Sequence, residues 1–243
     1  MNNFTVANEN PPIPSETLFG GAIYMINGSG MYGDGHSLRA RFINNLADSG
    51  SVIGLFDSSI NIQGAYFINN GNQSIEDTSV FHVSEESSAL DLNFSTIANN
   101  FSTSVFQVNN SGIVNLFGSI VYETFGNQIL ALADQKFDTF NFGCSIFHEN
   151  KSIGGDVFGT TGSIVSQNPG FVSEETANYH LRYDSIAIDR CDDNGLGINL
   201  NKDSDLDIRG YDLPNINNGF QGDYDVGADE VIDLIFANGF EES

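Results

Sequence analysis

The sequence has few basic residues, few prolines and no tryptophan. Eight Lys and Arg residues stand against 32 Asp and Glu residues in 243 positions, which gives a formal net charge of −24. A surface with this charge repels nucleic acid and anionic lipid, so we expect neither as a partner. Charged residues still make up only 16% of the chain and hydrophobic residues 40%, which excludes a disordered acidic tail.

Long apolar runs and a leader sequence are also missing. No stretch approaches the roughly 20 apolar residues that a membrane span requires. The opening residues, Met-Asn-Asn-Phe-Thr, lack the basic and apolar regions of a signal peptide, so we expect any export signal on a longer precursor. Cys144 and Cys191 are the two cysteines, and the absence of a CxxC spacing argues against a metal or redox motif.

An internal repeat is the main structural signal. Related segments start at Ile23, Val52, Val80, Val105 and Ile129, at steps of 29, 28, 25 and 24 residues. The second and fourth residues of each segment are apolar, which is typical of a strand with one buried face. This alternation predicts that Tyr24 and Ile26 point inward in the first segment, and that Phe81, Phe106 and Leu130 form one interior file.

Two further elements recur in most repeats. A second strand places one polar residue between apolar ones, and we expect an outward column of Asn61, Asp91, Asn115 and Asn141. A third element carries paired asparagines at 44–45, 69–70 and 99–100, which tolerate left-handed backbone and can form stacked amide ladders. A small residue stands two positions before the first apolar residue of this third element in each repeat. We expect these small residues to form a tight inward corner: Ala40, Ala65, Ser95, Gly118 and Cys144.

Three strands per repeat predict an all-β fold, a right-handed parallel β-helix of about six coils that forms a monomeric rod. We expect residues 1–166 to form the coils, truncated at the N-terminus, and residues 167–231 to form an irregular C-terminal cap over the last coil. Residues 232–243 form a separate tail. The alternative is a β-sandwich, whose strands have no reason to keep equivalent residues at a fixed period.

Several motifs resemble known bacterial families. Gly20-Gly-Ala-Ile23 and the Phe-Ile-Asn-Asn segments at 42 and 67 resemble the GGAI and FxxN repeats of polymorphic outer-membrane proteins, which are adhesin and autotransporter β-helices. The C-terminal part is similar to secreted right-handed β-helix proteins of the choice-of-anchor kind, with motifs that begin at Asn168, Tyr179, Ser185, Asp205 and Asp225. Residues 234–241 resemble the sorting tails of exported gammaproteobacterial proteins. These resemblances imply a secreted or cell-surface location and name no reaction.

A run of alternating aspartates is the candidate metal site. Asp203, Asp205 and Asp207 offer three carboxylates in one short stretch, and oxygen-rich loops suit Ca²⁺. The EF-hand pattern is excluded, because its Gly and Glu positions counted from Asp203 hold Ile208 and Pro214. A looser Ca²⁺ site and a solvated acidic loop both stay open.

The two cysteines also leave two alternatives open. A disulfide between Cys144 and Cys191 would tie the last full coil to the cap, as suits an exported protein. The place of Cys144 in the small inward column equally suits a free buried thiol.

No acid/base pair emerges from the repeats. Lyases on this fold use Lys or Arg beside acidic groups, and glycosidases need carboxylates roughly 5 to 10 Å apart. The outward column offers only Asp91 among asparagines. We therefore predict a non-catalytic, adhesin-like scaffold that contacts extracellular polysaccharide or a host or cell-surface component. The alternative is the C-terminal part of a carbohydrate-active β-helix enzyme, a lyase or a hydrolase, with its catalytic coils upstream of Met1.

Overall fold

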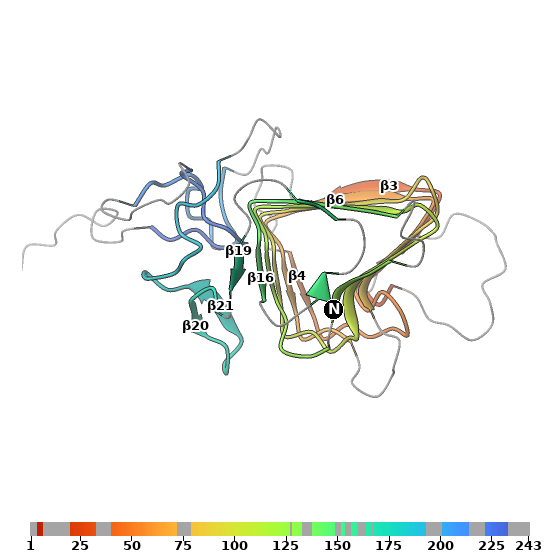
Figure 1. Cartoon of the computed structure of the whole chain (residues 1–243), viewed down its shortest axis with the longest axis horizontal. Helices are drawn as coiled ribbons and strands as arrows, with labels where there is room; N and C mark the ends of the chain where they lie inside the picture. Colours follow the sequence, from red (N-terminus) through yellow and green to blue (C-terminus); the bar gives the residue numbers. More distant parts are fainter. Residues whose placement is uncertain are drawn as a thin grey trace, which may run out of the picture.

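The computed structural model describes residues 4–6, 20–32, 40–71, 79–126, 128–132, 138–148, 152–153, 157–159, 164–166, 168–192, 201–213 and 222–232. Within these ranges the chain consists of strands and turns without a helix, which confirms the all-β prediction. The strands wind into parallel sheets stacked as a β-helix (Figure 1). Membrane-spanning helices are accordingly absent from the described ranges.

Each coil contributes one strand to each of three parallel sheets. The first sheet consists, in order, of β1 (Phe4–Val6), β2 (Ile23–Ile26), β5 (Ile53–Phe56), β8 (Ser79–Ser84), β11 (Ser104–Asn109), β14 (Gln128–Leu132) and β17 (Ser152–Ile153). The second consists of β3 (Ser29–Tyr32), β6 (Ser59–Gln63), β9 (Ala89–Asn93), β12 (Ile113–Phe117), β15 (Thr139–Gly143) and β18 (Val157–Gly159). The third consists of β4 (Arg41–Ile43), β7 (Tyr66–Ile68), β10 (Thr96–Ala98), β13 (Ile120–Tyr122), β16 (Ile146–His148) and β19 (Ile164–Ser166). An antiparallel pair, β20 (Phe171–Ser173) and β21 (Asn178–Leu181), follows the coils.

Four coils, from β5 to β16, carry most of the continuous apolar core, rather than the expected six or so. One coil on each side, β2–β4 and β17–β19, extends the sheets, and β2 adds Ile23 and Met25 to the core. Each of the four inner coils has a stacked neighbour on both sides. In a solenoid a repeat buries its apolar face only against such neighbours, so the inner coils form the stable body.

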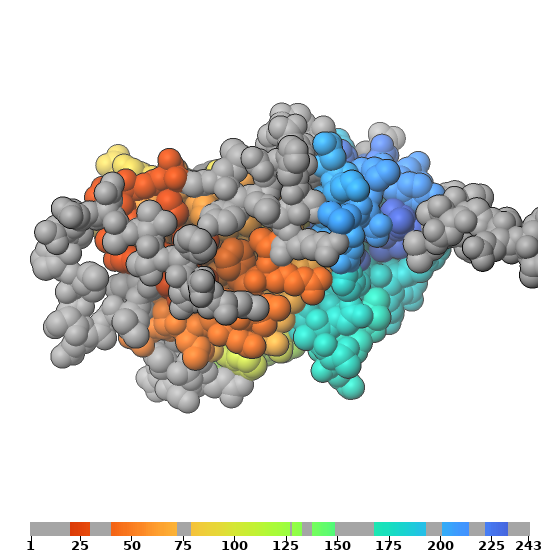
Figure 2. All heavy atoms as spheres, turned by 180° about the vertical axis from the view of Figure 1, so that it is seen from behind, coloured from red at the N-terminus to blue at the C-terminus, as the bar shows by residue number. Residues whose placement is uncertain are grey.

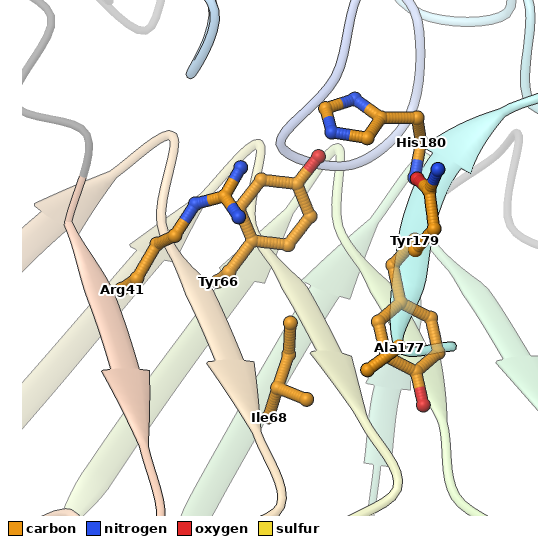
Figure 3. Close-up of a pocket in the computed structure, with 7 residues that line it drawn as sticks. Arg41, Tyr66, Ile68, Ala177, Tyr179 and His180 are labelled. Carbon is orange, nitrogen blue, oxygen red and sulfur yellow. The ribbon is translucent and has the colours of Figure 1, made fainter. Parts of the chain in front are cut away.

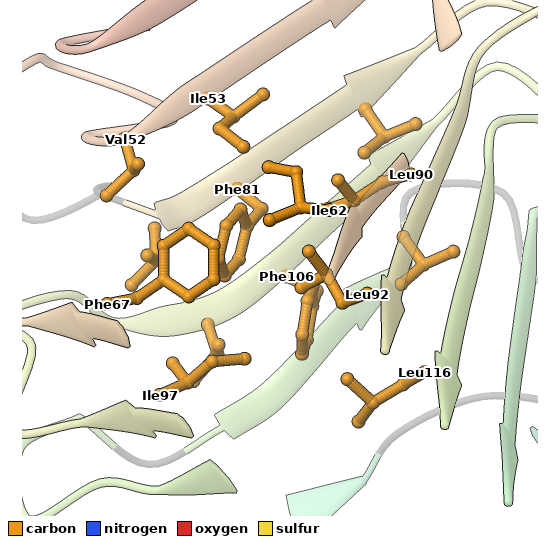
Figure 4. Close-up of a cluster of buried hydrophobic side chains, with 14 of the residues drawn as sticks. Val52, Ile53, Ile62, Phe67, Phe81, Leu90, Leu92, Ile97, Phe106 and Leu116 are labelled. Atoms are coloured by element: carbon orange, nitrogen blue, oxygen red, sulfur yellow. The ribbon is translucent and has the colours of Figure 1, made fainter. Parts of the chain in front are cut away.

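The predicted interior file is confirmed. Phe81 pairs with Phe106, and Phe106 pairs with Leu130, across three successive strands of the first sheet. All three side chains are buried, and the two Phe rings stack with centroids 5.1 Å apart (Figure 4). Apolar residues of the second sheet, including Leu92 and Leu116, face this file from across the coil (Figure 4).

The predicted outward column on the second sheet is also confirmed. Asn61, Asp91, Asn115 and Asn141 pair in register along the sheet. The Asn115 amide donates to Asp91 at 2.6 Å, and the Asn141 amide donates to Asn115 at 2.7 Å. These side chains are half-buried, so the outer surface of this sheet is a polar ladder open to solvent on one side.

A buried amide ladder follows the strands of the third sheet, as expected. The side-chain amide of Asn45 donates to Asn70 at 2.9 Å, that of Asn70 to Asn100 at 2.8 Å, and that of Asn100 to Glu123 at 2.5 Å. The asparagine before each of these three, at 44, 69 and 99, has a positive φ of 58°, 56° and 53°. Asn adopts that backbone conformation more readily than most residues, which explains why the pair recurs at the corner.

The prediction for the first coil was wrong by one residue. Ile23 and Met25 pair with the inward residues of β5 and are buried, whereas Tyr24 and Ile26 point outward and are half-buried. All four residues from Ile23 to Ile26 are apolar, so alternation alone gives no phase for this strand. A slip of one residue exchanges the two faces of a strand.

The small-residue corner was also misassigned in two coils. Along the third sheet Phe67 pairs with Ile97, Ile97 with Val121, and Val121 with Phe147. The corner residues, two positions earlier, are therefore Ser119 and Ser145 instead of Gly118 and Cys144. The Ser119 hydroxyl accepts the amide of Ser95 at 3.1 Å, and the Ser145 hydroxyl accepts the amide of Ser119 at 3.3 Å. These coils carry apolar residues on both faces of the third-sheet strand, which conceals the true register.

The C-terminal region, residues 168–192, 201–213 and 222–232, lies along the side of the coils (Figures 1 and 2). The expectation that it covers the last coil was wrong. Its apolar residues pack on the outer face of the third sheet in a second buried cluster that includes Tyr66, Ile68, Phe94, Ile120, Tyr122, Phe171, Tyr179, Leu181, Val226 and Ala228. Backbone contacts fasten it there: the Gly227 amide donates to Gly118 at 2.7 Å, and the Ala228 amide donates to the Thr96 hydroxyl at 3.0 Å.

A disulfide joins the two parts. Cys144 and Cys191 are bonded across 5.9 Å between their α carbons. Cys144 has a positive φ of 45° and belongs to the outer cluster, so the inward free thiol is the alternative that the structure excludes. The bond ties the fifth strand triplet, β14–β16, to the C-terminal region.

Replacing Asn100 tests the buried ladder. Its side-chain oxygen accepts both amides of Asn70, and its nitrogen donates to Phe67 and Glu123. We expect Asn100→Ala to lower the free energy of unfolding by about 3 kcal/mol, because buried partners lose their hydrogen bonds. Urea unfolding followed by circular dichroism measures the loss. The half-exposed Asn115→Ala is the matched control and should cost less than about 1 kcal/mol; equal losses would contradict a special role for the buried ladder.

Reducing the disulfide tests its contribution. It closes a loop between residues 47 positions apart, for which loop entropy predicts about 4 kcal/mol. Dithiothreitol should therefore lower the melting temperature of the native chain. The double variant Cys144→Ala/Cys191→Ala should melt at the same temperature as the reduced native chain, and dithiothreitol should not change its melting temperature. Two reactive thiols in the unreduced, denatured chain would show that the bond does not form.

Candidate functional site at the junction of the third sheet and the C-terminal region

The three aspartates of the predicted Ca²⁺ site lie in one turn of the C-terminal region. Asp203 is buried, and its Oδ1 accepts the backbone amides of Asp205 at 2.8 Å and Asp207 at 2.9 Å. Its Oδ2 accepts the amide of Glu230 at 2.9 Å. Burial raises the pKa of the Asp203 carboxyl, although these backbone hydrogen bonds oppose the shift. Asp203 thus holds the turn, and Ca²⁺ binding by the three carboxylates stays a prediction.

A different group of ligand atoms meets beside this turn. One atom each from His180, Asp205 and Asp229 lies within 4.8 Å of the other two, the single such group among the described residues. The His180 Nδ1 is 3.0 Å from Asp205 Oδ2 and 2.9 Å from Asp229 Oδ1. The hydrogen bond to Asp229 raises the pKa of His180 against the effect of burial, and the charges of both carboxylates add to it. The group therefore attracts positive charge.

A cavity of about 210 Å³ adjoins the group, lined in part by Arg41, Tyr66 and His180 (Figure 3). Tyr66 is 1% exposed, and its hydroxyl points toward the His180 imidazole (Figure 3). The Arg41 guanidinium lies 4.9 Å from the centre of the Tyr66 ring and 3.9 Å from Asp205 Oδ1. One wall of the cavity thus comes from the coils and the other from the C-terminal region.

The Tyr66 hydroxyl is buried and makes no hydrogen bond of normal geometry among the described residues. Burial raises its pKa well above the usual value, and the charge of Asp229 adds to the shift. The neighbouring Ser204 hydroxyl acts in the opposite direction, yet its oxygen is also without a hydrogen bond of normal geometry. A buried polar atom without a partner is uncommon in folded proteins and calls for an explanation.

Sequence reasoning identified one member of this group, Asp205. His180 is one of four histidines with no regular spacing in the sequence, and Asp229 belongs to the C-terminal motif that begins at Asp225. The two lie 49 residues apart with no regular spacing. One feature of the sequence could have indicated that they meet. Both stand in motifs, Tyr179-His-Leu181 and the segment ending at Glu230, that resemble motifs of the same choice-of-anchor proteins.

Other acidic residues of the C-terminal motifs hold the region together. Arg209 and Glu230 are fully buried and lie 3.6 Å apart. Arg209 donates to the backbone oxygens of Asp225 at 3.2 Å and Gly227 at 2.6 Å. Burial raises the pKa of Glu230 to about 7, although Arg209 opposes the shift. These contacts shape the segment that docks on the third sheet, which is a structural role.

Asp189 continues this buried network. Its backbone amide donates to Asp225 Oδ1 at 2.7 Å, and its own Oδ2 accepts the amide of Leu213 at 3.0 Å. Its Oδ1 is buried without a hydrogen bond among the described residues. Burial raises the pKa of Asp189 to about 6, and the Leu213 amide opposes this. The carboxyl is therefore more easily protonated in the folded chain than in the unfolded one.

The remaining described histidines lie away from the group. His82 faces outward on the first sheet, but it is only 6% exposed, and its Nδ1 is 2.9 Å from the Ser49 hydroxyl. Burial lowers the pKa of His82. His148 ends β16 and contacts the Tyr122 ring, with ring centroids 4.9 Å apart. His36 lies outside the described residues.

The variant Asp189→Asn tests the raised pKa of Asp189 through the pH dependence of the free energy of unfolding. The folded pKa of Asp189, about 6, exceeds the ordinary value of 3.8, so the folded chain gains protons relative to the unfolded chain between these values. Stability is then lost as the pH rises through this window. We expect the free energy of unfolding of the variant, minus that of the native chain, to increase from pH 4 to pH 7. A difference independent of pH, measured by urea unfolding, would contradict the raised pKa.

The position of the chain among known proteins rests on its own motifs and structure. It matches no protein-family model, no curated protein and no solved structure. The parallel β-helix is shown by the strand pairing of this chain. Kinship with polymorphic outer-membrane or choice-of-anchor proteins stays a prediction that the quoted motifs support.

Proposed function

We propose that the chain is a non-catalytic, adhesin-like scaffold at the cell surface or outside the cell, and that it contacts neutral polysaccharide along the outer face of its second sheet. The observation that carries the proposal is the in-register polar column of Asn61, Asp91, Asn115 and Asn141. Its side chains repeat at the strand spacing of about 4.8 Å and present amide donors and acceptors to an extended ligand.

The second sheet is the candidate because the outer face of the third is covered and central outward side chains of the first bond within the chain. The C-terminal region packs on the third sheet. On the first sheet, the Ser49 hydroxyl bonds to His82 and donates to Gln107 at 3.1 Å, so these outward side chains already have partners within the chain. The net charge of −24 disfavours acidic polysaccharides, so the ligand class is neutral.

The location outside the cytoplasm is supported by the disulfide. Structural disulfides persist in secreted and cell-surface proteins and are rare where thiols are kept reduced. The Cys144–Cys191 bond links two parts that share a buried cluster, which is a structural use of the bond. The resemblance of the GGAI and FxxN motifs to adhesin β-helices supports the same location.

Affinity electrophoresis tests the proposal. The full chain is run in native gels that contain dextran, galactomannan or mixed-linkage β-glucan, and we expect retardation by at least one of them. Asn115→Ala should weaken the retardation several-fold, because it removes the central donor of the column. Gln128→Ala, an exposed polar residue of the first sheet, is the matched control and should leave retardation unchanged.

Two results would contradict the proposal. The first is migration unaffected by every neutral polysaccharide tested, or an equal loss in both variants. The second is the release of reducing ends or unsaturated products, which would favour the carbohydrate-active alternative.

A further inference from the structure

We propose that His180, Asp205 and Asp229 bind a divalent transition metal ion, of which Zn²⁺ is the best match. The site goes beyond the scaffold function and is independent of polysaccharide binding. It is formed by β21, by the Asp203–Asp207 turn and by the segment that docks on the third sheet. An ion held there would therefore link three parts of the C-terminal region that are distant in sequence.

The separations of the ligand atoms suit such an ion. The His180 Nδ1 is 3.0 Å from Asp205 Oδ2 and 2.9 Å from Asp229 Oδ1. Ligands at about 2.0 to 2.1 Å from Zn²⁺ in a tetrahedral arrangement are about 3.4 Å apart. The His180 Nδ1 thus needs to separate from each carboxylate oxygen by only a few tenths of an ångström, and the two oxygens lie within 4.8 Å of each other. One Nδ1 proton cannot fully satisfy two carboxylates, whereas a divalent ion can.

Neighbouring hydrogen bonds orient two of the three ligands. Asp229 Oδ2 accepts the amide of Leu181 at 2.6 Å, which directs Oδ1 toward His180. Asp203 accepts the amides of Asp205 and Asp207 and so holds the turn that carries Asp205. Such outer contacts are a regular feature of metal sites, because they fix the ligands before the ion arrives.

The Tyr66 hydroxyl is the independent observation that points to a ligand here. It is buried, has no hydrogen bond of normal geometry among the described residues, and points toward His180 across the adjoining cavity (Figure 3). Transition metals bound by three protein ligands keep a fourth position for water. Among the described residues the Ser204 hydroxyl is the neighbouring polar group of the Tyr66 hydroxyl, without normal hydrogen-bond geometry, and a water molecule in that fourth position would give Tyr66 a well-placed partner.

The donor set favours Zn²⁺ over Ca²⁺. Ca²⁺ takes six to eight oxygen ligands, whereas imidazole with carboxylates suits zinc and its neighbours in the transition series. Asp203, which an all-oxygen site in the turn would require, already accepts three backbone amides. Arg41 approaches the other oxygen of Asp205, at 3.9 Å, and leaves Oδ2 toward His180.

Calorimetric titration of the full chain tests the site. The protein is treated with EDTA, desalted and titrated with ZnCl₂ at pH 7, and we expect one ion per chain. Asp205→Asn should weaken Zn²⁺ binding at least tenfold and still fold, because Asp205 is 41% exposed. His180→Gln should do the same. Asp207→Asn makes the same charge change in the same turn outside the ligand group, and should weaken binding less than threefold.

Visible absorption with Co²⁺ as the probe supplies a second readout. We expect the intense bands of a four-coordinate ion with the native chain, and their loss with His180→Gln. Absence of Zn²⁺ binding, or equal affinities in all four proteins, would overturn the proposal. So would an equal effect of Asp205→Asn and Asp207→Asn, which would mean that the ion responds to surface charge alone. Ca²⁺ binding that is tighter than Zn²⁺ binding and depends on Asp207 would instead favour the oxygen-only site in the turn.

Discussion

Parallel hydrogen bonding between successive coils, in register, is the constraint on which this structure depends. It brings each residue next to its counterpart in the coil above, so a file of Phe81, Phe106 and Leu130 and a ladder of asparagines are two results of one geometry. An amide suits such a stack because it both donates and accepts. The buried ladder ends on Glu123, whose carboxylate accepts from Asn100, so the direction of donation is the same along the whole column.

The same geometry explains which parts of the fold the sequence predicted. Parallel strands, three per coil, the core files and both polar columns follow from alternation at a fixed period. The predicted register was wrong where apolar and polar residues do not alternate. From Ile23 to Ile26 every residue is apolar, and at Ile120–Val121 and Ile146–Phe147 both faces of the strand carry apolar residues. In the last two cases the second apolar face is real, because the C-terminal region packs on it. Evidence for that docking was thus present in the sequence as an apparent irregularity of the repeat.

The candidate site was less accessible to sequence reasoning. Asp205 stood out because its carboxylate alternates with two others, but its partners His180 and Asp229 come from segments with no periodic relation to it. Only the docking of these segments along the third sheet brings them together, and that position was itself wrongly predicted as the end of the rod. A site built from irregular segments can be recognised from a sequence by shared motifs, whereas its geometry requires the fold.

Two groups of acidic residues in the C-terminal region differ in their hydrogen bonds. Asp203, Asp225 and Glu230 are buried, and backbone amides occupy both oxygens of each. Among the described residues no backbone amide donates to Asp205 Oδ2 or Asp229 Oδ1, and both oxygens meet on the one nitrogen of His180. In a chain with so large an excess of negative charge, a pair of carboxylate oxygens held together in this way is costly unless positive charge lies between them. A proton on His180 supplies one unit of positive charge, and a divalent ion supplies two. The docking that shapes the C-terminal region therefore also favours a cation at its junction with the coils.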